Sequence, residues 1–210
     1  SREHRMPKRL ACPNGQNNLL STMPKTERDI LFAHLTPVQL ERGKVLEHPG
    51  HPFGAVFFPI SGVGSMVAIG KDGRRIEVGL FGREGMSGTS LVSESDQTPN
   101  ETFMQVAGYG LSIQADGLRD LLDAHPAMQR HFLKFLHVLL IQTSHTALCN
   151  GHAKLEERLA RWLLMCHDRI EGDEMELTHE FLSVMLGVRR AGVTVGTHIL
   201  EGKGLIRATR

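Results

Sequence analysis

The 210-residue chain has few cysteines, few aromatic residues and no long apolar run. Its three cysteines, Cys12, Cys149 and Cys166, are far apart, and none forms a Cys-x-x-Cys pair. They are too few for a tetracysteine zinc or iron–sulfur site, and their number is typical of a reducing cytoplasm. No stretch approaches the roughly 18 apolar residues of a membrane span, and no apolar segment follows the basic N-terminus. We therefore expect a cytoplasmic protein without a membrane partner.

Motifs of common enzymes and metal sites are also missing. The sequence contains no P-loop, no nucleophile elbow and no His-Glu-x-x-His, and its 12 histidines are scattered. We expect solvated or capping roles for most of these histidines, no metal site and no enzymatic activity, while a cofactor is left unknown. The net charge of +1 gives no indication of a partner, whereas the local distribution of charge along the chain does.

The segment from Leu177 to Ile206 has the pattern of two short helices joined by a tight turn. Gly187 stands at the turn, where the chain needs a positive φ that glycine adopts at little cost. The second helix opens with Arg189 and Arg190. This pattern is typical of a helix-turn-helix, whose second helix enters the DNA major groove. The residues expected to lock the two helices together are Leu182, Leu186, Val188 and Val193.

Charge in this segment changes sign along the chain. Every charged residue of the stretch 171–180 is acidic, namely Glu171, Asp173, Glu174, Glu176 and Glu180. From 186 to 210 the charged residues are Arg189, Arg190, Lys203, Arg207 and Arg210 against Glu201 alone. A basic second helix suits a phosphate backbone. A small helical hairpin with a solvated basic face is the alternative interpretation.

The region from Gly43 to about Ile113 consists of short β-rich runs separated by Gly and Pro. Asp72-Gly73 between two alternating runs is the strongest short signal for a hairpin. So many short strands favour an antiparallel barrel or sandwich. A short helix is expected before this region, from Pro24 to about His34, followed by a capped helical turn at 36–39. The expected strands are Val45–Leu46, Ala55–Ile60, Gly64–Ile69, Ile76–Phe81, Phe103–Ala107 and Leu111–Ile113.

A long helix is predicted from Pro126 to about Asn150, with two neighbouring apolar stripes. One stripe contains Met128, Phe132, Phe135 and Leu139, and it can pack on the barrel. The other needs a second partner, for which an identical helix of another subunit is the simplest candidate. A helix buried within one chain is the alternative. The residues of the expected dimer contact are Leu133, Leu136, Leu140, Thr143 and Ala147.

These parts divide the chain into four segments. A loose arm is expected at 1–18, a sensing β domain at 19–124, a dimerisation helix at 125–150 and a DNA-binding domain at 151–210. Asn150-Gly151 reads as a helix stop and hinge. The helix after it, with Leu155, Leu159 and Trp162 on one face, should form the core of the last domain.

The order of barrel, long helix, hinge and helix-turn-helix, from about Pro24 to the end, resembles the cyclic-AMP receptor/Fnr (Crp/Fnr) superfamily of bacterial transcription regulators. The most specific stretches are Gly62–Gly88, with its Gly-Arg-Glu-Gly-Met, and Leu155–Ile206. The resemblance implies an α+β fold with an N-terminal antiparallel β-roll of the cyclic-nucleotide-binding type, a central dimer helix and a C-terminal winged helix-turn-helix. It also implies a homodimer that binds duplex DNA, RNA polymerase and a small-molecule effector. The sequence ends four residues after Ile206, so the wing is truncated or not shown.

Carried over to this sequence, the base-reading run of the family, Arg-Glu-x-x-x-Arg, becomes Arg190-Ala191-Gly192-Val193-Thr194-Val195. The guanidinium fork of Arg190 can grip guanine or a phosphate, whereas Ala191 and Val195 can only touch thymine methyls. Gly192 and Gly196 each weaken the helix, and either a close approach or support from neighbouring elements would explain them. The expected DNA contacts are Arg189, Arg190, Ala191, Thr194, Val195 and His198.

In the family, a Gly-rich turn cradles a cyclic phosphate, a Glu holds the ribose, and an Arg with Ser or Thr grips the phosphate. Here Arg83 lies at the place of the ribose Glu, and Asn100-Glu101 replaces the phosphate-binding pair. We therefore expect that cyclic AMP is not bound in the usual way. A structural corner of the barrel is the other interpretation of this run, and a haem site rests only on the number of histidines. The candidate effector residues are Gly82, Arg83, Glu84, Gly85, Met86, Asn100, Glu101 and Thr102.

The leading hypothesis is a dimeric, effector-responsive transcription regulator. The alternative is a ligand- or partner-sensing module of the same fold whose helical tail makes protein contacts. The missing wing and the two helix glycines leave this alternative open.

Overall fold

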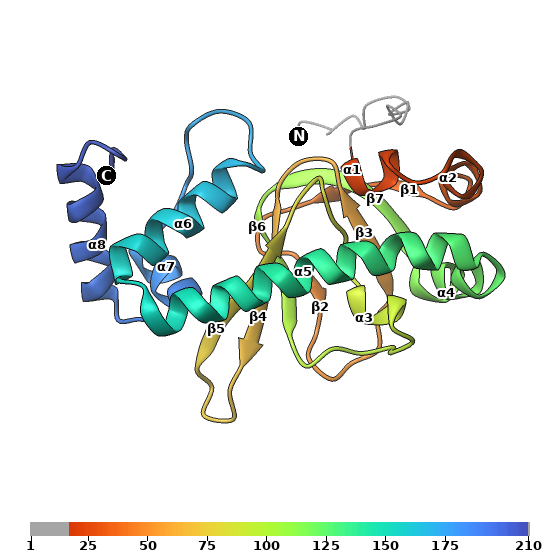
Figure 1. Ribbon diagram of the computed structural model, residues 1–210, viewed down its shortest axis with the longest axis horizontal. Coiled ribbons are helices and arrows are strands. Elements are labelled where there is room, and N and C mark those ends of the chain that lie inside the picture. Colours follow the sequence, from red (N-terminus) through yellow and green to blue (C-terminus); the bar gives the residue numbers. More distant parts are fainter. Residues whose placement is uncertain (1–16, 210) are drawn as a thin grey trace, which may run out of the picture.

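The computed structural model describes residues 17–209. Two antiparallel sheets form the β-roll, which is followed by the long helix α5 (Pro126–His152) and a helical unit at the opposite end of that helix (Figure 1). The three-stranded sheet has the order β1-β7-β3, and the four-stranded sheet has the order β2-β6-β4-β5. The strands are β1 (Thr36–Leu40), β2 (Val45–Glu47), β3 (Ala55–Pro59), β4 (Val63–Ile69), β5 (Arg75–Phe81), β6 (Glu101–Val106) and β7 (Gly108–Gln114).

Four short helices surround the roll. They are α1 (Asn18–Ser21), α2 (Lys25–Phe32), α3 (Thr89–Val92) and α4 (Ala115–Ala124). Asn17 anchors the start of α1, because its amide donates to the carbonyls of Pro59 (2.7 Å) and Gly85 (3.0 Å) while its oxygen accepts from the Leu20 N–H. Most of the arm expected at 1–18 lies outside the described residues, and its last part is fixed against the roll.

The predicted strands are confirmed with small shifts of their ends, and so is the hairpin at Asp72-Gly73. Gly73 has φ +78°, and Asp72 accepts from the Arg74 backbone N–H. The helical turn expected at 36–39 is wrong, because these residues belong to β1. Pro37 is tolerated there since β1 is an edge strand, and the strand pairs with residues 108–112 of β7, far along the chain.

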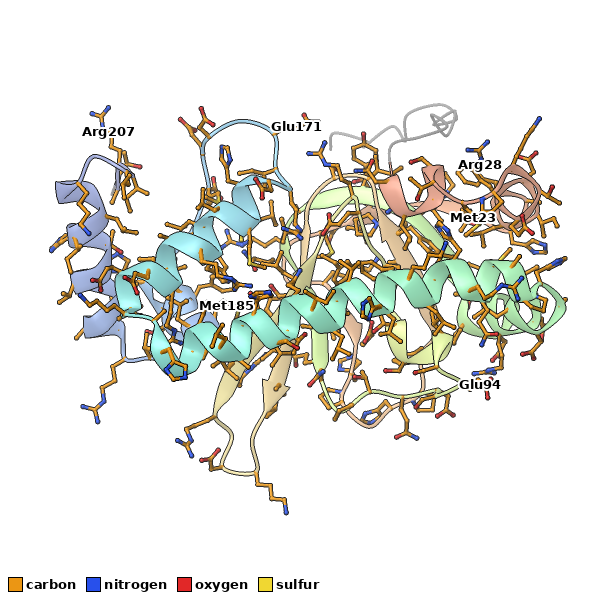
Figure 2. The ribbon with its side chains drawn as sticks, viewed as in Figure 1. Met23, Arg28, Glu94, Glu171, Met185 and Arg207 are labelled. Carbon is orange, nitrogen blue, oxygen red and sulfur yellow. The ribbon has the colours of Figure 1, made fainter. Side chains whose placement is uncertain are left out.

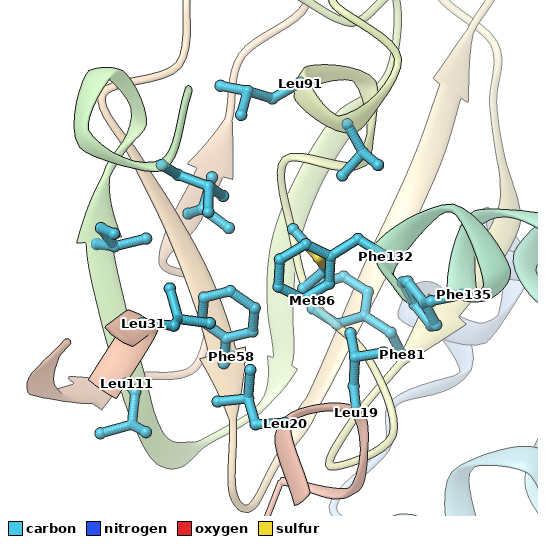
Figure 3. Packing of buried hydrophobic residues seen from close by; sticks show 14 of the residues in the cluster. Leu19, Leu20, Leu31, Phe58, Phe81, Met86, Leu91, Leu111, Phe132 and Phe135 are labelled. Atoms are coloured by element: carbon cyan, nitrogen blue, oxygen red, sulfur yellow. The ribbon is translucent and has the colours of Figure 1, made fainter. Parts of the chain in front are cut away.

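The core of the roll is closed by α5. Phe132 and Phe135 project from this helix toward Phe58, Phe81 and Met86 of the roll (Figure 3). Further along α5, the Gln142 amide accepts from the Leu80 N–H (2.8 Å) and donates to the Leu80 carbonyl (3.0 Å). These bonds satisfy backbone groups of β5, the edge strand of its sheet. The stripe of α5 that begins at Met128 is thus confirmed as the side that packs on the roll.

The helix stop expected at Asn150-Gly151 lies two residues too early. Gly151 is inside α5, which ends at His152, and α6 (Leu155–His167) begins after a two-residue connection. The break is defined at Lys154, whose backbone N–H donates to the Glu157 carboxylate across the first turn of α6. By length and composition alone α5 meets the criteria for a membrane-crossing helix. Only part of this helix is buried, with Phe132 and Leu139 packed against the roll.

Candidate DNA-binding surface and effector corner

Helices α6, α7 (His179–Leu186) and α8 (Arg190–Gly202) form the C-terminal unit, which is called the DNA-binding unit below. Thr178 caps α7 by accepting from the Phe181 N–H (3.1 Å). The core of the unit contains Leu159, Trp162, Leu182, Leu186 and Val193, each no more than 5% exposed. The expected helix locks are confirmed, except that Val188 is only half-buried.

Gly187 makes the turn between α7 and α8. It has φ +62°, and its N–H donates to the Val184 carbonyl (3.1 Å). A Cβ at this position would also lie 2.9 Å from Ile76 Cδ1 of β5. Gly187 is therefore required for two reasons, the backbone conformation and the close approach of the roll. The sequence predicted the positive φ at Gly187 but not its close approach to Ile76.

Helix α8 lies at the end of the molecule farthest from α4, and Arg207 projects beyond it (Figures 1 and 2). Five of the six expected DNA contacts are exposed on or just before this helix, namely Arg189, Arg190, Ala191, Val195 and His198. The sixth, Thr194, is half-buried, and its hydroxyl lies 3.1 Å from His179 Nδ1 of α7. The geometry therefore presents one exposed face with a basic N-terminal end, and it turns Thr194 partly toward α7.

Gly192 and Gly196 of α8 face α6. A Cβ at Gly196 would meet Leu159 Cδ2 at 3.5 Å, an ordinary contact, whereas a Cβ at Gly192 would meet Leu155 Cδ2 at 2.9 Å. The close approach that would explain an α8 glycine is therefore found at Gly192. No such contact requires glycine at position 196, where the helix is supported by its neighbour α6.

None of the eight candidate effector residues lines the cleft beside Arg42 or the smaller pocket beside Trp162. Glu84 pairs with Arg169, which follows α6 (2.6 Å), and Glu101 pairs with Arg75 of β5. Met86 and Thr102 are fully buried in the roll. Arg83 Nε is buried without a hydrogen-bond partner among the described residues. Glu84 of the Gly-rich run therefore joins the roll to the DNA-binding unit through its ion pair with Arg169.

Glu47 of β2, which the sequence analysis did not single out, fills the turn after that run. It is 4% exposed, and its two carboxyl oxygens accept from the Gly88 N–H (2.5 Å) and the Thr102 hydroxyl (3.1 Å). Burial raises the pKa of Glu47, and these two hydrogen bonds lower it in part. A backbone N–H at the turn, the kind of donor that could serve a phosphate, thus already bonds to a side chain of the protein.

A cleft of about 370 Å³ separates the roll from the DNA-binding unit. One wall comes from the turn at 61–62 and from the end of β6 at 105–107, and the other from the loop at 169–176, where Figure 2 labels Glu171. Arg42 crosses the mouth, 3.6 Å from Glu176, and both side chains are largely exposed. Among the described residues, no group of three His, Cys, Asp or Glu side chains could hold a metal ion.

A β-roll, a long helix and a terminal helix-turn-helix define the class of this protein, and comparison with known proteins gives its relatives. Residues 157–210 match the model of the Crp-like helix-turn-helix domain. No curated protein sequence matches the chain.

Solved structures match over most of the length. The c-di-GMP responsive global regulator CLP of Xanthomonas campestris is 21% identical, with a TM-score of 0.69 over 89% of this chain and 96% of that one. A Crp/Fnr-family regulator of Eubacterium rectale is 15% identical, with a TM-score of 0.74 over 93% and 92% of the two chains. FixK2 of Bradyrhizobium japonicum is 14% identical, with a TM-score of 0.70 over 84% and 89%. The chain therefore has the fold of the Crp/Fnr structures, and its C-terminal unit matches the model of the Crp-like helix-turn-helix domain.

Replacing Gly196 by Ala should raise the free energy of unfolding by about 1 kcal/mol, because Ala stabilises a helix and its Cβ fits against Leu159. Urea denaturation measures the change. Gly192→Ala is the matched control and should gain less, since its Cβ would displace Leu155. A loss of stability in Gly196→Ala would show that the α6–α8 packing is misassigned.

Proposed function

We propose that this protein is a dimeric, sequence-specific DNA-binding transcription regulator in which α8 enters the major groove. The observation that carries the proposal is the exposed face of α8, whose N-terminal end presents Arg189 and Arg190 at the far end of a Crp-like helix-turn-helix unit. A guanidinium at the first turn of a recognition helix can reach both base edges and phosphates. RNA polymerase is the partner that such a regulator would contact once bound to DNA.

Val195, which is 59% exposed, extends the same face with an apolar side chain. A side chain of this kind contacts thymine methyl groups in the major groove and forms no hydrogen bond with a base. Base reading by hydrogen bonds is therefore concentrated at Arg190. The operator should combine a G·C pair read by Arg190 with A·T pairs beside Ala191 and Val195.

Dimerisation through α5 is supported by the side of the helix that faces away from the roll. Leucine and isoleucine side chains there are between 40% and 61% exposed, namely Leu133, Leu140, Ile141 and Leu148. A contiguous apolar face of this kind marks an interaction surface. A second copy of α5 is the occupant we propose, since an identical helix presents the same stripe about a two-fold axis.

The proposed contact differs in part from the residues expected from the sequence. Leu133, Leu140 and Ala147 are exposed, whereas Leu136 and Thr143 are half-buried at the edge of the roll. Ile141 and Leu148 were not expected. They lie eight and fifteen residues after Leu133, a spacing that a helical wheel centred on the buried phenylalanines would have placed on the outer face.

The DNA contacts predict different effects for the two arginines. Arg190→Ala should weaken binding to the specific site by about 1–3 kcal/mol and relax its specificity, because a bidentate base contact is lost. Arg189→Ala should weaken binding to specific and random duplexes alike, because we assign it to phosphate. Fluorescence anisotropy with the operator and a scrambled duplex measures both. Equal losses on both duplexes for both variants would contradict the assignment.

Introducing carboxylates into the proposed α5–α5 contact tests the dimer. Replacing Leu133 and Leu140 by Glu should yield monomers, because unpaired carboxylates would be buried in the contact. Leu164→Glu is the control, since Leu164 is equally exposed (64%) but lies on α6. Sedimentation at micromolar concentration distinguishes the two states. A monomeric unmodified protein under these conditions would refute the proposal.

We further propose that the effector is not cyclic AMP. A buried cyclic phosphate needs a paired charge, and the aligned positions offer Asn100 and Glu101, of which the latter pairs with Arg75. Glu47 already accepts from the Gly88 N–H. The cleft beside Arg42 and Arg169 is the place we propose for a different small molecule.

Isothermal titration with cyclic AMP and cyclic GMP should therefore give no binding in the micromolar range. This result is expected because Glu47 already accepts from the Gly88 N–H and because Asn100 stands where the family has the phosphate-binding Arg. Micromolar dissociation that Arg83→Ala abolishes, while the exposed Arg119→Ala leaves it intact, would show that Arg83 turns inward and that the cradle opens.

A further inference from the structure

The DNA-binding unit rests on the four-stranded sheet of the roll, and this docking contact contains more than apolar groups. Val63, Val67 and Leu80 of the sheet belong to the same buried cluster as Leu159 and Trp162 of α6. Within the contact lie three polar side chains of the sheet, all almost completely buried: Ser65 (0% exposed), Glu77 (6%) and Gln105 (3%).

These side chains form a continuous chain of contacts that begins and ends on α6. Trp162 Nε1 donates to Glu77 Oε1 (2.8 Å), and Glu77 Oε2 lies 2.7 Å from the hydroxyl oxygen of Ser65. The same hydroxyl lies 2.5 Å from Gln105 Oε1, and Gln105 Nε2 donates to Cys166 Sγ (3.2 Å). Both ends of the chain therefore cross from the roll to the DNA-binding unit.

With the Gln105 amide oriented so that Nε2 donates to Cys166 Sγ, counting protons shows which form of Glu77 fits this chain. The Ser65 hydroxyl has one hydrogen, but its two neighbours are a Glu77 oxygen and the Gln105 carbonyl. If Glu77 is ionised, both neighbours are acceptors, and one close contact has no hydrogen. If Glu77 is protonated, it donates to Ser65, which donates to Gln105. Every group of the chain is then satisfied.

The arginine side chains around Glu77 form no hydrogen bond with its carboxyl group. Three arginines lie near Glu77, but their hydrogen bonds go to other acceptors. Arg158 donates to the Leu186 carbonyl, Arg161 to the Thr146 hydroxyl, and Arg169 to Glu84. The thiols of Cys149 on α5 and Cys166 on α6 are the other titratable groups, while α7 contributes Met185 and Leu186, which do not titrate. A carboxylate buried without an ion-pair partner is costly, which favours the neutral form.

We propose that Glu77 is a proton-operated latch: its protonated carboxyl group holds the DNA-binding unit on the roll, and its ionisation releases that unit. No metal, cofactor or covalent step is involved, since a single proton exchanges with water. The proposal deepens the proposed function by giving it a means of regulation. It depends on that function only for its consequence, because release itself can be measured without DNA.

The direction of the pH dependence follows from the docked and released states. Burial raises the pKa of docked Glu77 to about 7, while the hydrogen bonds of Ser65 and Trp162 and the charges of Arg169 and Arg161 lower it in part. A released Glu77 in water has its ordinary value of 4.5. The docked state thus binds the proton more tightly. Docking is strongest below pH 4.5, weakens as the pH rises toward 7, and is weakest above it, by roughly three hundredfold in the docking constant.

Trp162, the single tryptophan of the chain, provides the test. Its emission spectrum should shift to longer wavelength between pH 5.5 and 8.5 as the indole leaves the contact and meets water. Glu77→Gln should keep the short-wavelength emission over the whole range, because an amide accepts from Trp162 and donates to Ser65 as the protonated acid does. Glu171→Gln, an exposed carboxylate on the same unit, is the matched control and should behave as the unmodified protein.

A second measurement covers the case in which Glu77→Gln does not fold, which circular dichroism reveals. The infrared band of protonated carboxyl groups should weaken as the tryptophan emission shifts, and this change should persist in Glu47→Gln, which removes the other buried carboxyl group whose pKa is raised. Coincident changes support the latch. An emission spectrum that does not change with pH, or the same pH profile in Glu77→Gln and the unmodified protein, overturns it.

Discussion

One side of α5 is packed into the roll and the other faces water, and the rest of the structure depends on this asymmetry. Phe132 and Phe135 complete the core of the roll, and Gln142 satisfies the backbone of β5 at Leu80. A helix of 27 residues spans about 40 Å, so the same rigid element reaches the DNA-binding unit. Its outer stripe leaves Leu140 61% exposed, which a single copy of the chain does not cover.

The DNA-binding unit is placed by contacts of a different kind. It meets the roll through an apolar cluster, the Glu84–Arg169 pair and the polar chain around Glu77. A buried polar chain is stabilising only when each member is satisfied, so it specifies one arrangement more sharply than apolar packing alone. The orientation of α8 relative to α5 therefore depends on β4, β5 and β6. In a dimer this orientation would set the distance between two recognition helices, which must match the spacing of DNA half-sites.

Local signals in the sequence predicted local structure well. Asp72-Gly73, Pro126 and Gly187 mark a hairpin, a helix start and a helix turn because their backbone preferences act within a few residues. Pairing between distant segments leaves no local signal, so the sequence predicts a helical turn at 36–39, whereas these residues belong to a strand beside β7. The sequence also gives no signal that Glu77 is buried. It alternates with Ile76 and Val78 as a surface residue of a strand would, and it is buried only because a second unit covers that face.

The central claim is that α8 binds duplex DNA, and the salt dependence of binding tests it most directly. Lys and Arg side chains that contact phosphates release counterions, so the logarithm of affinity must fall linearly with the logarithm of salt concentration. We predict measurable binding to a random duplex at low salt, with a negative slope that becomes shallower by about one unit in Arg189→Ala. No binding at low salt, or an affinity that salt does not change, would contradict the account and favour a module whose helices contact another protein.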